Sequence, residues 1–298
     1  MPAFPPHYAP LADFVAPAVG RAQLWRTLAG LVVAGLATFV LGSAFGLVLV
    51  STGGLQSERS LQDLTQGTTP LGLVMLLFAY LPLTLAIGLA TVGVAKRRMI
   101  SLIGPPGAAL RCFLWVAVPL LGLWALLTPL SVMDENVQHH LDIVQQLPWL
   151  PVALTGLFIQ TGTEELVFRG YLQQQLAARW TSPWVWMVMP SLLFGALHYS
   201  PQEYGASALF VVCWAVLFGF AAADLTARTG NLGAAAGLHF ANNAATMLLV
   251  GLSGRLDALT LYTAQLDQTA AWSQLPYLAI DTLSLLVGWL SARVILRV

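Results

Sequence analysis

The chain has 298 residues, of which 57% are hydrophobic and only 9% are charged. A soluble domain carries roughly 25% charged residues, so this composition excludes an ordinary soluble domain and favours a protein whose solvent is lipid. Lys+Arg and Asp+Glu number 13 each, and a zero net charge gives no electrostatic footprint for nucleic-acid binding.

The N-terminal segment, residues 1–26, is rich in proline and has its basic residues, Arg21 and Arg26, near its end. A secretory signal peptide places its positive charge first and its apolar run directly afterwards. We therefore expect residues 1–26 to form a cytosolic tail. The rest of the chain, residues 27–298, is expected to form a single helical membrane domain.

Apolar segments of membrane-spanning length recur along this domain. A bilayer core of about 30 Å needs roughly 20 apolar residues per helix, and eight segments meet that need, at 27–50, 70–95, 113–131, 148–178, 183–200, 207–227, 231–251 and 275–294. The sequence therefore predicts an all-α polytopic membrane protein with about eight transmembrane helices, the fourth and fifth interrupted by polar residues.

The basic residues orient these spans. With eight spans and a cytosolic N-terminus, most Lys and Arg residues fall on the cytosolic side, namely Arg21, Arg26, Lys96, Arg97, Arg98, Arg111, Arg179, Arg228, Arg293 and Arg297. Only Arg59 and Arg255 fall outside, and Arg169 lies within a span. The positive-inside rule thus places both termini in the cytosol, and we expect a multi-pass protein of a bacterial inner membrane.

The fourth span carries two adjacent carboxylates, Glu164 and Glu165. A carboxylate near the bilayer centre costs about 2.5–3.5 kcal/mol, so two of them need a reason. Glu165 and Arg169 stand four residues apart and are expected to pair on one helix face. Glu164 points about 100° away, toward Phe168 and Tyr171, and is expected to face a cavity. A purely structural polar cluster is the alternative.

The fifth and seventh spans add imidazole and amide groups, His198 in the former and His239 with Asn243 in the latter. Alone, each group is as well explained by packing or interhelical hydrogen bonding. At about 1.5 Å per residue, however, Glu164 and His198 both lie about 22 Å from the cytosolic ends of their helices, with His239 and Asn243 at about 12 and 18 Å. This overlap in depth predicts one shared site.

Three segments, EELVFRGYL, FGALH and RTGNLGAAAGLHFANN, resemble the EExxxR, FxxxH and HxxxN motifs of the CAAX-protease and bacteriocin-processing family of intramembrane endopeptidases. The resemblance covers about residues 148–250, the expected catalytic core, and implies hydrolysis of a peptide bond in a membrane-associated protein or peptide. Glu164 and His198 would then activate water, and His239 and Asn243 would bind the oxyanion. Asn242, beside Asn243, is able to share its role.

Three further interpretations stay open at this point. Glu164, His198 and His239 also form a three-ligand zinc set with one open position, although the sequence contains no HExxH; we favour the mechanism that needs no cofactor. A non-enzymatic immunity or scaffold protein, or a proton pathway, would use the same polar residues without hydrolysis. The substrate itself leaves no signal in the sequence.

Overall fold

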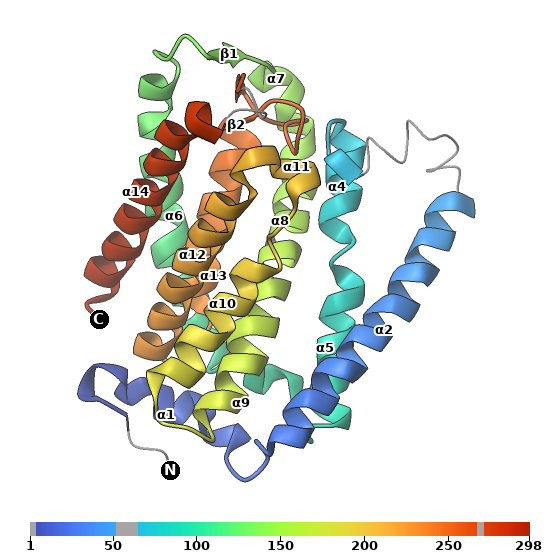
Figure 1. Cartoon of the computed structure of the whole chain (residues 1–298), viewed down its shortest axis with the longest axis vertical. Coiled ribbons are helices and arrows are strands. Elements are labelled where there is room, and N and C mark those ends of the chain that lie inside the picture. Colours follow the sequence, from blue (N-terminus) through green and yellow to red (C-terminus); the bar gives the residue numbers. More distant parts are fainter. Residues whose placement is uncertain (1–3, 52–64, 267–270) are drawn as a thin grey trace.

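The computed structural model describes residues 4–51, 65–266 and 271–298, and it consists mainly of helices packed side by side (Figure 1). The longer helices are α2 (Leu24–Ser51), α4 (Pro70–Phe78), α5 (Leu81–Gly93), α6 (Pro106–Ser131), α8 (Leu150–Glu165), α10 (Met189–Ala196), α12 (Ala208–Thr229), α13 (Gly233–Ala244) and α14 (Ala271–Leu296). Shorter helices are α1 (Ala9–Val15), α7 (Ile143–Gln146), α9 (Gln174–Ala177) and α11 (Pro201–Tyr204). The prediction of an all-α membrane protein is confirmed.

Among the described residues, the helices long and apolar enough to cross a membrane are Leu24–Ser51, Pro70–Gly93, Pro106–Ser131, Pro201–Thr229 and Gln274–Leu296. The predicted spans 148–178, 183–200 and 231–251 do not meet the same criterion. These three segments carry the motif residues, and the second of them contains an apolar helix, Trp184–Ala196, that is shorter than 18 residues. Five spans are therefore supported by length and composition, and the count of eight stays a prediction.

The helices that carry the motif residues share a second property. Each adjoins a π-helical segment: Leu166–Gln173 follows α8, Trp184–Val188 precedes α10 and Ala245–Leu249 follows α13. The other helices of the described ranges contain no such segment. A π turn is wider than an α turn and appears often at functional sites, so it changes which face the following residues present.

Close helix contacts position these elements, and glycines permit them. A Cβ added to Gly237 on α13 would lie 2.8 Å from the Phe113 carbonyl oxygen of α6. One added to Gly219 on α12 would lie 2.8 Å from the Cα of Ser191 on α10. Because small residues let helix backbones approach, α13 and α10 are held against α6 and α12 at fixed distances.

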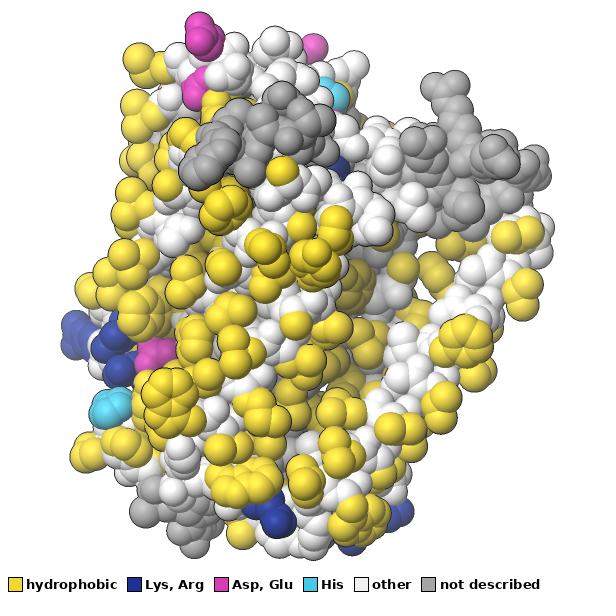
Figure 2. Space-filling model, viewed as in Figure 1, with side chains coloured by type: hydrophobic (Ala, Val, Ile, Leu, Met, Phe, Trp, Pro, Cys, Tyr) yellow, Lys and Arg dark blue, Asp and Glu magenta, His cyan; other side chains and the backbone are white. Residues whose placement is uncertain are grey.

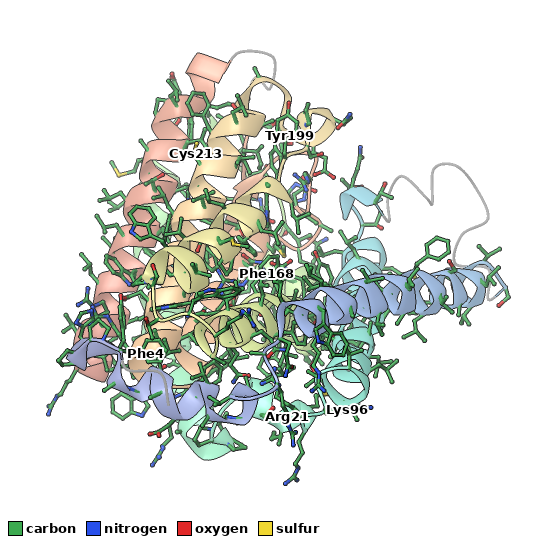
Figure 3. The ribbon with its side chains drawn as sticks, turned by 60° about the horizontal axis from the view of Figure 1, so that its bottom comes forward. Phe4, Arg21, Lys96, Phe168, Tyr199 and Cys213 are labelled. Atoms are coloured by element: carbon green, nitrogen blue, oxygen red, sulfur yellow. The ribbon has the colours of Figure 1, made fainter. Side chains whose placement is uncertain are left out.

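The N-terminal segment is folded against the bundle. Helix α1 lies across one end of it (Figures 1 and 3), and Leu11, Phe14 and Val15 are buried. Gln174 donates a hydrogen bond from Nε2 to the Phe14 carbonyl oxygen at 2.7 Å, and Tyr8 donates one to Asp224 at 2.8 Å. The expected tail is thus a packed element, and its cytosolic location stays a prediction.

The opposite end carries a small sheet that the sequence did not predict. Strands β1 (Val137–His139), β3 (Tyr262–Ala264) and β2 (Val250–Leu252) pair in the order β1-β3-β2, with β1–β3 antiparallel and β2–β3 parallel. Strands of three residues are too short to show a period of two in the sequence. The sheet joins the end of the predicted span 231–251, where β2 begins, to two segments that were expected to lie between spans.

Charge is distributed unevenly between the two ends. Arg21 and Lys96 lie at the end that carries α1 (Figure 3), whereas Asp134 and Asp142 flank β1 at the other end (Figure 1). Apolar side chains cover much of the face between them (Figure 2). Arg59 lies outside the described residues. An apolar flank beside an end that carries basic residues is typical of a membrane protein.

Candidate active site

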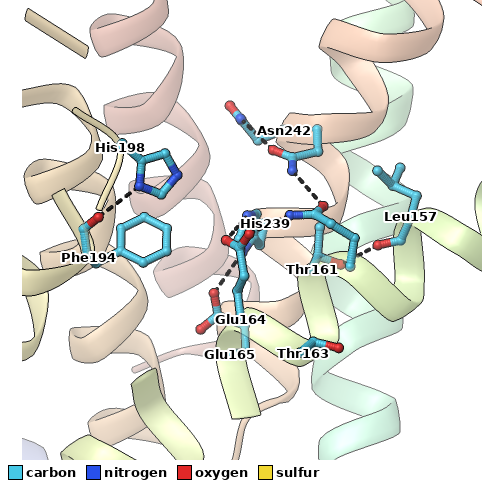
Figure 4. A network of polar contacts seen from close by, with 12 residues as sticks. Leu157, Thr161, Thr163, Glu164, Glu165, Phe194, His198, His239 and Asn242 are labelled. Atoms are coloured by element: carbon cyan, nitrogen blue, oxygen red, sulfur yellow. Dashed lines mark hydrogen bonds and ion pairs between the residues drawn. The ribbon is translucent and has the colours of Figure 1, made fainter. Parts of the chain in front are cut away.

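The motif residues meet between three elements (Figure 4). Glu164 and Glu165 end helix α8, His239 and Asn243 lie on α13, and His198 lies in the turn that follows α10. The contacts among them fall into a buried ion cluster around Glu165 and a chain of amides that ends on Glu164.

Glu165 is the centre of the ion cluster and is completely buried. Arg169, also buried, donates from Nη1 to Glu165 Oε1 at 3.0 Å and from Nη2 to the Gly219 carbonyl oxygen at 3.2 Å. The predicted Glu165–Arg169 pair is therefore present. The guanidinium also lies 4.9 Å from the ring centroid of Phe194, so the cation is covered by an aromatic side chain as well as paired.

Glu165 also contacts His239, which the sequence did not predict. His239 Nδ1 lies 2.7 Å from Glu165 Oε1, and its Nε2 lies 3.6 Å from Glu164 Oε2. The imidazole is thus placed between two carboxylates, and it packs on Phe218 with ring centroids 4.7 Å apart. Since Nδ1–H donates to Glu165, Nε2 is the ring nitrogen that faces Glu164 and any reactant beside it.

The two oxygens of Glu164 have different surroundings. Gln160 donates from Nε2 to Glu164 Oε1 at 2.8 Å. Glu164 Oε2 is buried and has no hydrogen-bond partner within the described part of the chain, while 12% of the side chain as a whole is exposed. One carboxylate oxygen is therefore held by Gln160, and the other is left without a hydrogen-bond donor from the described residues.

The amide chain continues from Gln160 onto α13. Asn243 donates from Nδ2 to Gln160 Oε1 at 3.0 Å, and Asn242 donates from Nδ2 to Asn243 Oδ1 at 3.3 Å (Figure 4). Asn243 is thus the amide in contact with α8, whereas Asn242 stands behind it. An Asn side chain has two N–H groups, so Asn243 keeps one donor beyond the bond to Gln160.

His198 stands apart from the carboxylates. Its Nδ1 lies 2.8 Å from the Phe194 carbonyl oxygen, and its ring lies 4.5 Å from the Phe194 ring, which in turn lies 6.2 Å from His239. No contact between His198 and Glu164 occurs in the described residues. Helix α10 ends at Ala196, so a turn carries His198, and its expected action beside Glu164 stays a prediction.

Two residues of this site were not predicted from the sequence. Gln160, 6% exposed, links Glu164 to Asn243, and its signal was available as an amide one helical turn before Glu164 in an apolar span. Tyr80 interacts with both Glu164 and Gln160. It comes from the junction of α4 and α5, 84 positions before Glu164 in number, and no local pattern marks it.

The three side chains of the alternative zinc ligand set, Glu164, His198 and His239, do not converge in the structure. Within the described ranges, no three His, Cys, Asp or Glu side chains form a group that could hold a metal ion. Of the proposed ligands, His239 faces Glu164 at 3.6 Å, but His198 is turned toward the Phe194 carbonyl. The arrangement of these residues does not fit a zinc centre, and metal dependence of the protein stays untested.

Comparison with known proteins adds independent findings. Residues 146–245 match the family described as type II CAAX prenyl endopeptidase Rce1-like. Over 245 residues the chain is 28% identical to "Uncharacterized protein YyaK" of Bacillus subtilis (strain 168), a match that covers 78% of this chain and 79% of that protein. No solved structure matches the chain. Over residues 146–245, which contain every motif residue described above, this membrane protein matches the Rce1-like CAAX-protease family, as its three motifs predicted.

Proposed function

We propose that this chain is an intramembrane endopeptidase that hydrolyses a peptide bond of a membrane-associated protein or peptide, with Glu164 as the group that activates water. The observation that carries the proposal is the contrast between the two oxygens of Glu164. Oε1 accepts from Gln160, whereas Oε2 is buried, faces His239 Nε2 at 3.6 Å and has no hydrogen-bond partner in the described ranges.

The reaction follows from that position. A water molecule beside Oε2 gives its proton to Glu164 as its oxygen attacks the scissile carbonyl carbon, and the carbonyl oxygen becomes an oxyanion. Collapse of the tetrahedral intermediate breaks the C–N bond, and Glu164 returns the proton to the leaving amine. One water is consumed, and the carboxylate is restored. Such acid–base catalysis contributes typically 10²–10⁴-fold to the rate.

The oxyanion needs donors that are already in place. Asn243 supplies the N–H that its bond to Gln160 leaves over. His239 supplies Nε2–H when the ring is protonated, and the Glu165 carboxylate at Nδ1 stabilises that cation. Arg169 partly neutralises Glu165, so the ring is supported without a full second negative charge close to Glu164.

His198 is proposed to act from the other side of the Phe194 ring. With Nδ1–H donated to the Phe194 carbonyl oxygen, its Nε2 is an acceptor that can orient the water or receive a hydrogen bond from the leaving amine. This role requires no contact with Glu164 before substrate is bound. It predicts a smaller loss of rate on replacement of His198 than on replacement of Glu164.

We further propose that the chain has eight spans and that both termini face the cytosol of a bacterial cell. The basic residues Arg21 and Lys96, at the end of the bundle that carries α1, support this orientation because Lys and Arg are enriched on the cytosolic side. Reporter fusions at both termini test it, and an external signal from either terminus contradicts it.

Comparative proteomics of membranes tests the hydrolytic function. Membranes that contain the wild-type protein are compared with membranes that contain Glu164→Gln at the same abundance. We expect at least one membrane-associated protein to show a new terminus with wild type alone. Identical termini in both preparations would favour a scaffold protein, which needs no ionised carboxylate at position 164.

A further inference from the structure

We infer that Gln160 is a positioning residue, which couples the ionised Glu164 carboxylate to the orientation of the Asn243 amide that binds the oxyanion. This inference rests on the proposed function, since it concerns how the same site is organised. It assigns to Gln160 no contact with substrate.

The geometry that carries the inference is the use of both ends of one side-chain amide. Gln160 Nε2 donates to Glu164 Oε1 at 2.8 Å, and Gln160 Oε1 accepts from Asn243 Nδ2 at 3.0 Å. Asn242 extends the series by donating to Asn243 Oδ1 at 3.3 Å. Four side chains on two helices thus form a continuous series of hydrogen bonds.

The direction of this series is fixed by charge. An ionised carboxylate can only accept hydrogen bonds, so Gln160 must turn its NH₂ group toward Glu164. The Gln160 carbonyl oxygen then faces Asn243, which must donate a hydrogen bond to it from its own NH₂ group. The ionised state of Glu164 therefore determines which end of Asn243 faces the site, and hydrogen bonds in such chains polarise one another.

The same bonds join the two helices that hold the catalytic groups. Helices α8 and α13 are connected by the Glu165–His239 contact at 2.7 Å and, four residues further along α13, by the Gln160–Asn243 bond. Gln160 is 6% exposed, and a buried amide costs free energy unless its groups are paired. An apolar residue would serve packing alone equally well, so the amide indicates a need for its two bonds.

Replacement of Gln160 by Met tests the inference, because Met fills a similar volume without hydrogen-bonding groups. Both Glu164 and Asn243 would then be free to rotate. A misplacement of about 1 Å at a reacting group can cost 10²-fold in rate, so we expect kcat to fall about 10–100-fold while KM changes less than about 2-fold. Rates are measured per folded molecule, on a substrate found by the membrane comparison above.

A matched control comes from Gln173, a completely buried glutamine on the continuation of the same helix. It donates to the Ala223 carbonyl oxygen at 3.0 Å and contacts α12 instead of the site. Gln173→Met removes a buried amide in the same way, and we expect it to lower folded yield while kcat stays at the wild-type value.

A double-mutant cycle separates positioning from a merely structural role. If Gln160 acts through Asn243, Gln160→Met should cost at least about 3-fold less in an Asn243→Ala background than in wild type. Gln160→Glu, which still accepts from Asn243 but cannot donate to Glu164 while ionised, should also lower kcat and provides a second variant if Gln160→Met folds poorly.

The outcomes distinguish the proposed catalytic role of Glu164 from the positioning role of Gln160. If Glu164→Gln cleaves as wild type does, the proposed role of Glu164 as the base is wrong whatever Gln160 does. If Glu164→Gln is inactive and both Gln160 variants keep wild-type kcat, the proposed function stands and the positioning role is wrong. Strict additivity of Gln160→Met with Asn243→Ala would also overturn the positioning role, because it leaves the two residues uncoupled.

Discussion

Replacement of Glu165 by Gln should destabilise the protein strongly. The change keeps the side-chain shape and an acceptor for His239 Nδ1, but it removes the negative charge beside Arg169. That guanidinium is 2% exposed, and within the described residues its other hydrogen-bond acceptor is the Gly219 carbonyl oxygen. Glu165→Gln therefore removes the carboxylate that is paired with this cation in a region of low dielectric, and leaves only the longer-range charge of Glu164.

The magnitude follows from the 3.0 Å separation of Arg169 Nη1 and Glu165 Oε1. At an effective dielectric constant of about 20 the Coulomb attraction is roughly 5 kcal/mol. Removal of one partner of a buried pair in soluble proteins costs about 3–5 kcal/mol. We therefore expect the melting midpoint in detergent to fall on the order of 10 °C, together with a lower monodisperse yield.

A double variant provides the control. Glu165→Gln with Arg169→Met removes both charges and leaves an apolar side chain among the aromatic rings that now cover the guanidinium, of which Phe194 is the nearest. It should recover part of the lost midpoint. A Glu165→Gln protein that melts as wild type does, or a double variant no more stable than the single one, would refute the role of this pair.

Three further expectations follow from the structure. Gly219→Val should lower the free energy of unfolding by about 1–3 kcal/mol, because a Cβ at this position lies 2.8 Å from the Ser191 Cα. The measurement is the melting midpoint, and an unchanged midpoint contradicts the close packing of α10 and α12. Burial and the neighbouring Asp224 raise the pKa of Tyr8 from 10.0 to about 12. The contribution of this shift to stability is therefore complete below pH 10 and is lost as the pH rises toward 12. Tyr8→Phe should remove this part of the pH dependence of melting, and an alkaline melting profile identical to that of wild type would contradict the role of Tyr8. Strong chelation should leave most of the cleavage activity, and a loss that zinc alone restores would replace the metal-free mechanism.

The contact between Glu165 and Arg169 was predictable because it depends only on spacing along one helix. The helix face on which the residues after Glu165 lie was not predictable in the same way. Beyond Glu165 the chain continues as a π-helical segment, so a regular α-helical wheel places those residues wrongly. Tyr171 was expected on the Glu164 face, yet its hydroxyl donates to the Arg26 carbonyl oxygen on α2 at 3.3 Å.

Contacts between helices were predictable in kind but not in detail. Their similar depth in the membrane predicted that Glu164, His239 and Asn243 share one site. Depth does not determine the rotation of a helix about its axis. The contact of His239 with Glu165, the role of Gln160 and the turn that carries His198 all depend on that rotation or on where a helix ends. Tyr80 reaches the site through tertiary packing alone, which no local pattern encodes.

The most direct test of the account is the cleavage rate of Glu164→Gln per folded molecule, measured beside wild type in the same bilayer. The amide keeps the shape of the side chain and cannot accept the proton of the attacking water. We predict a melting midpoint close to that of wild type and a rate at least about 10²-fold lower. A Glu164→Gln protein that cleaves at more than a tenth of the wild-type rate would contradict the assignment of Glu164 as the base.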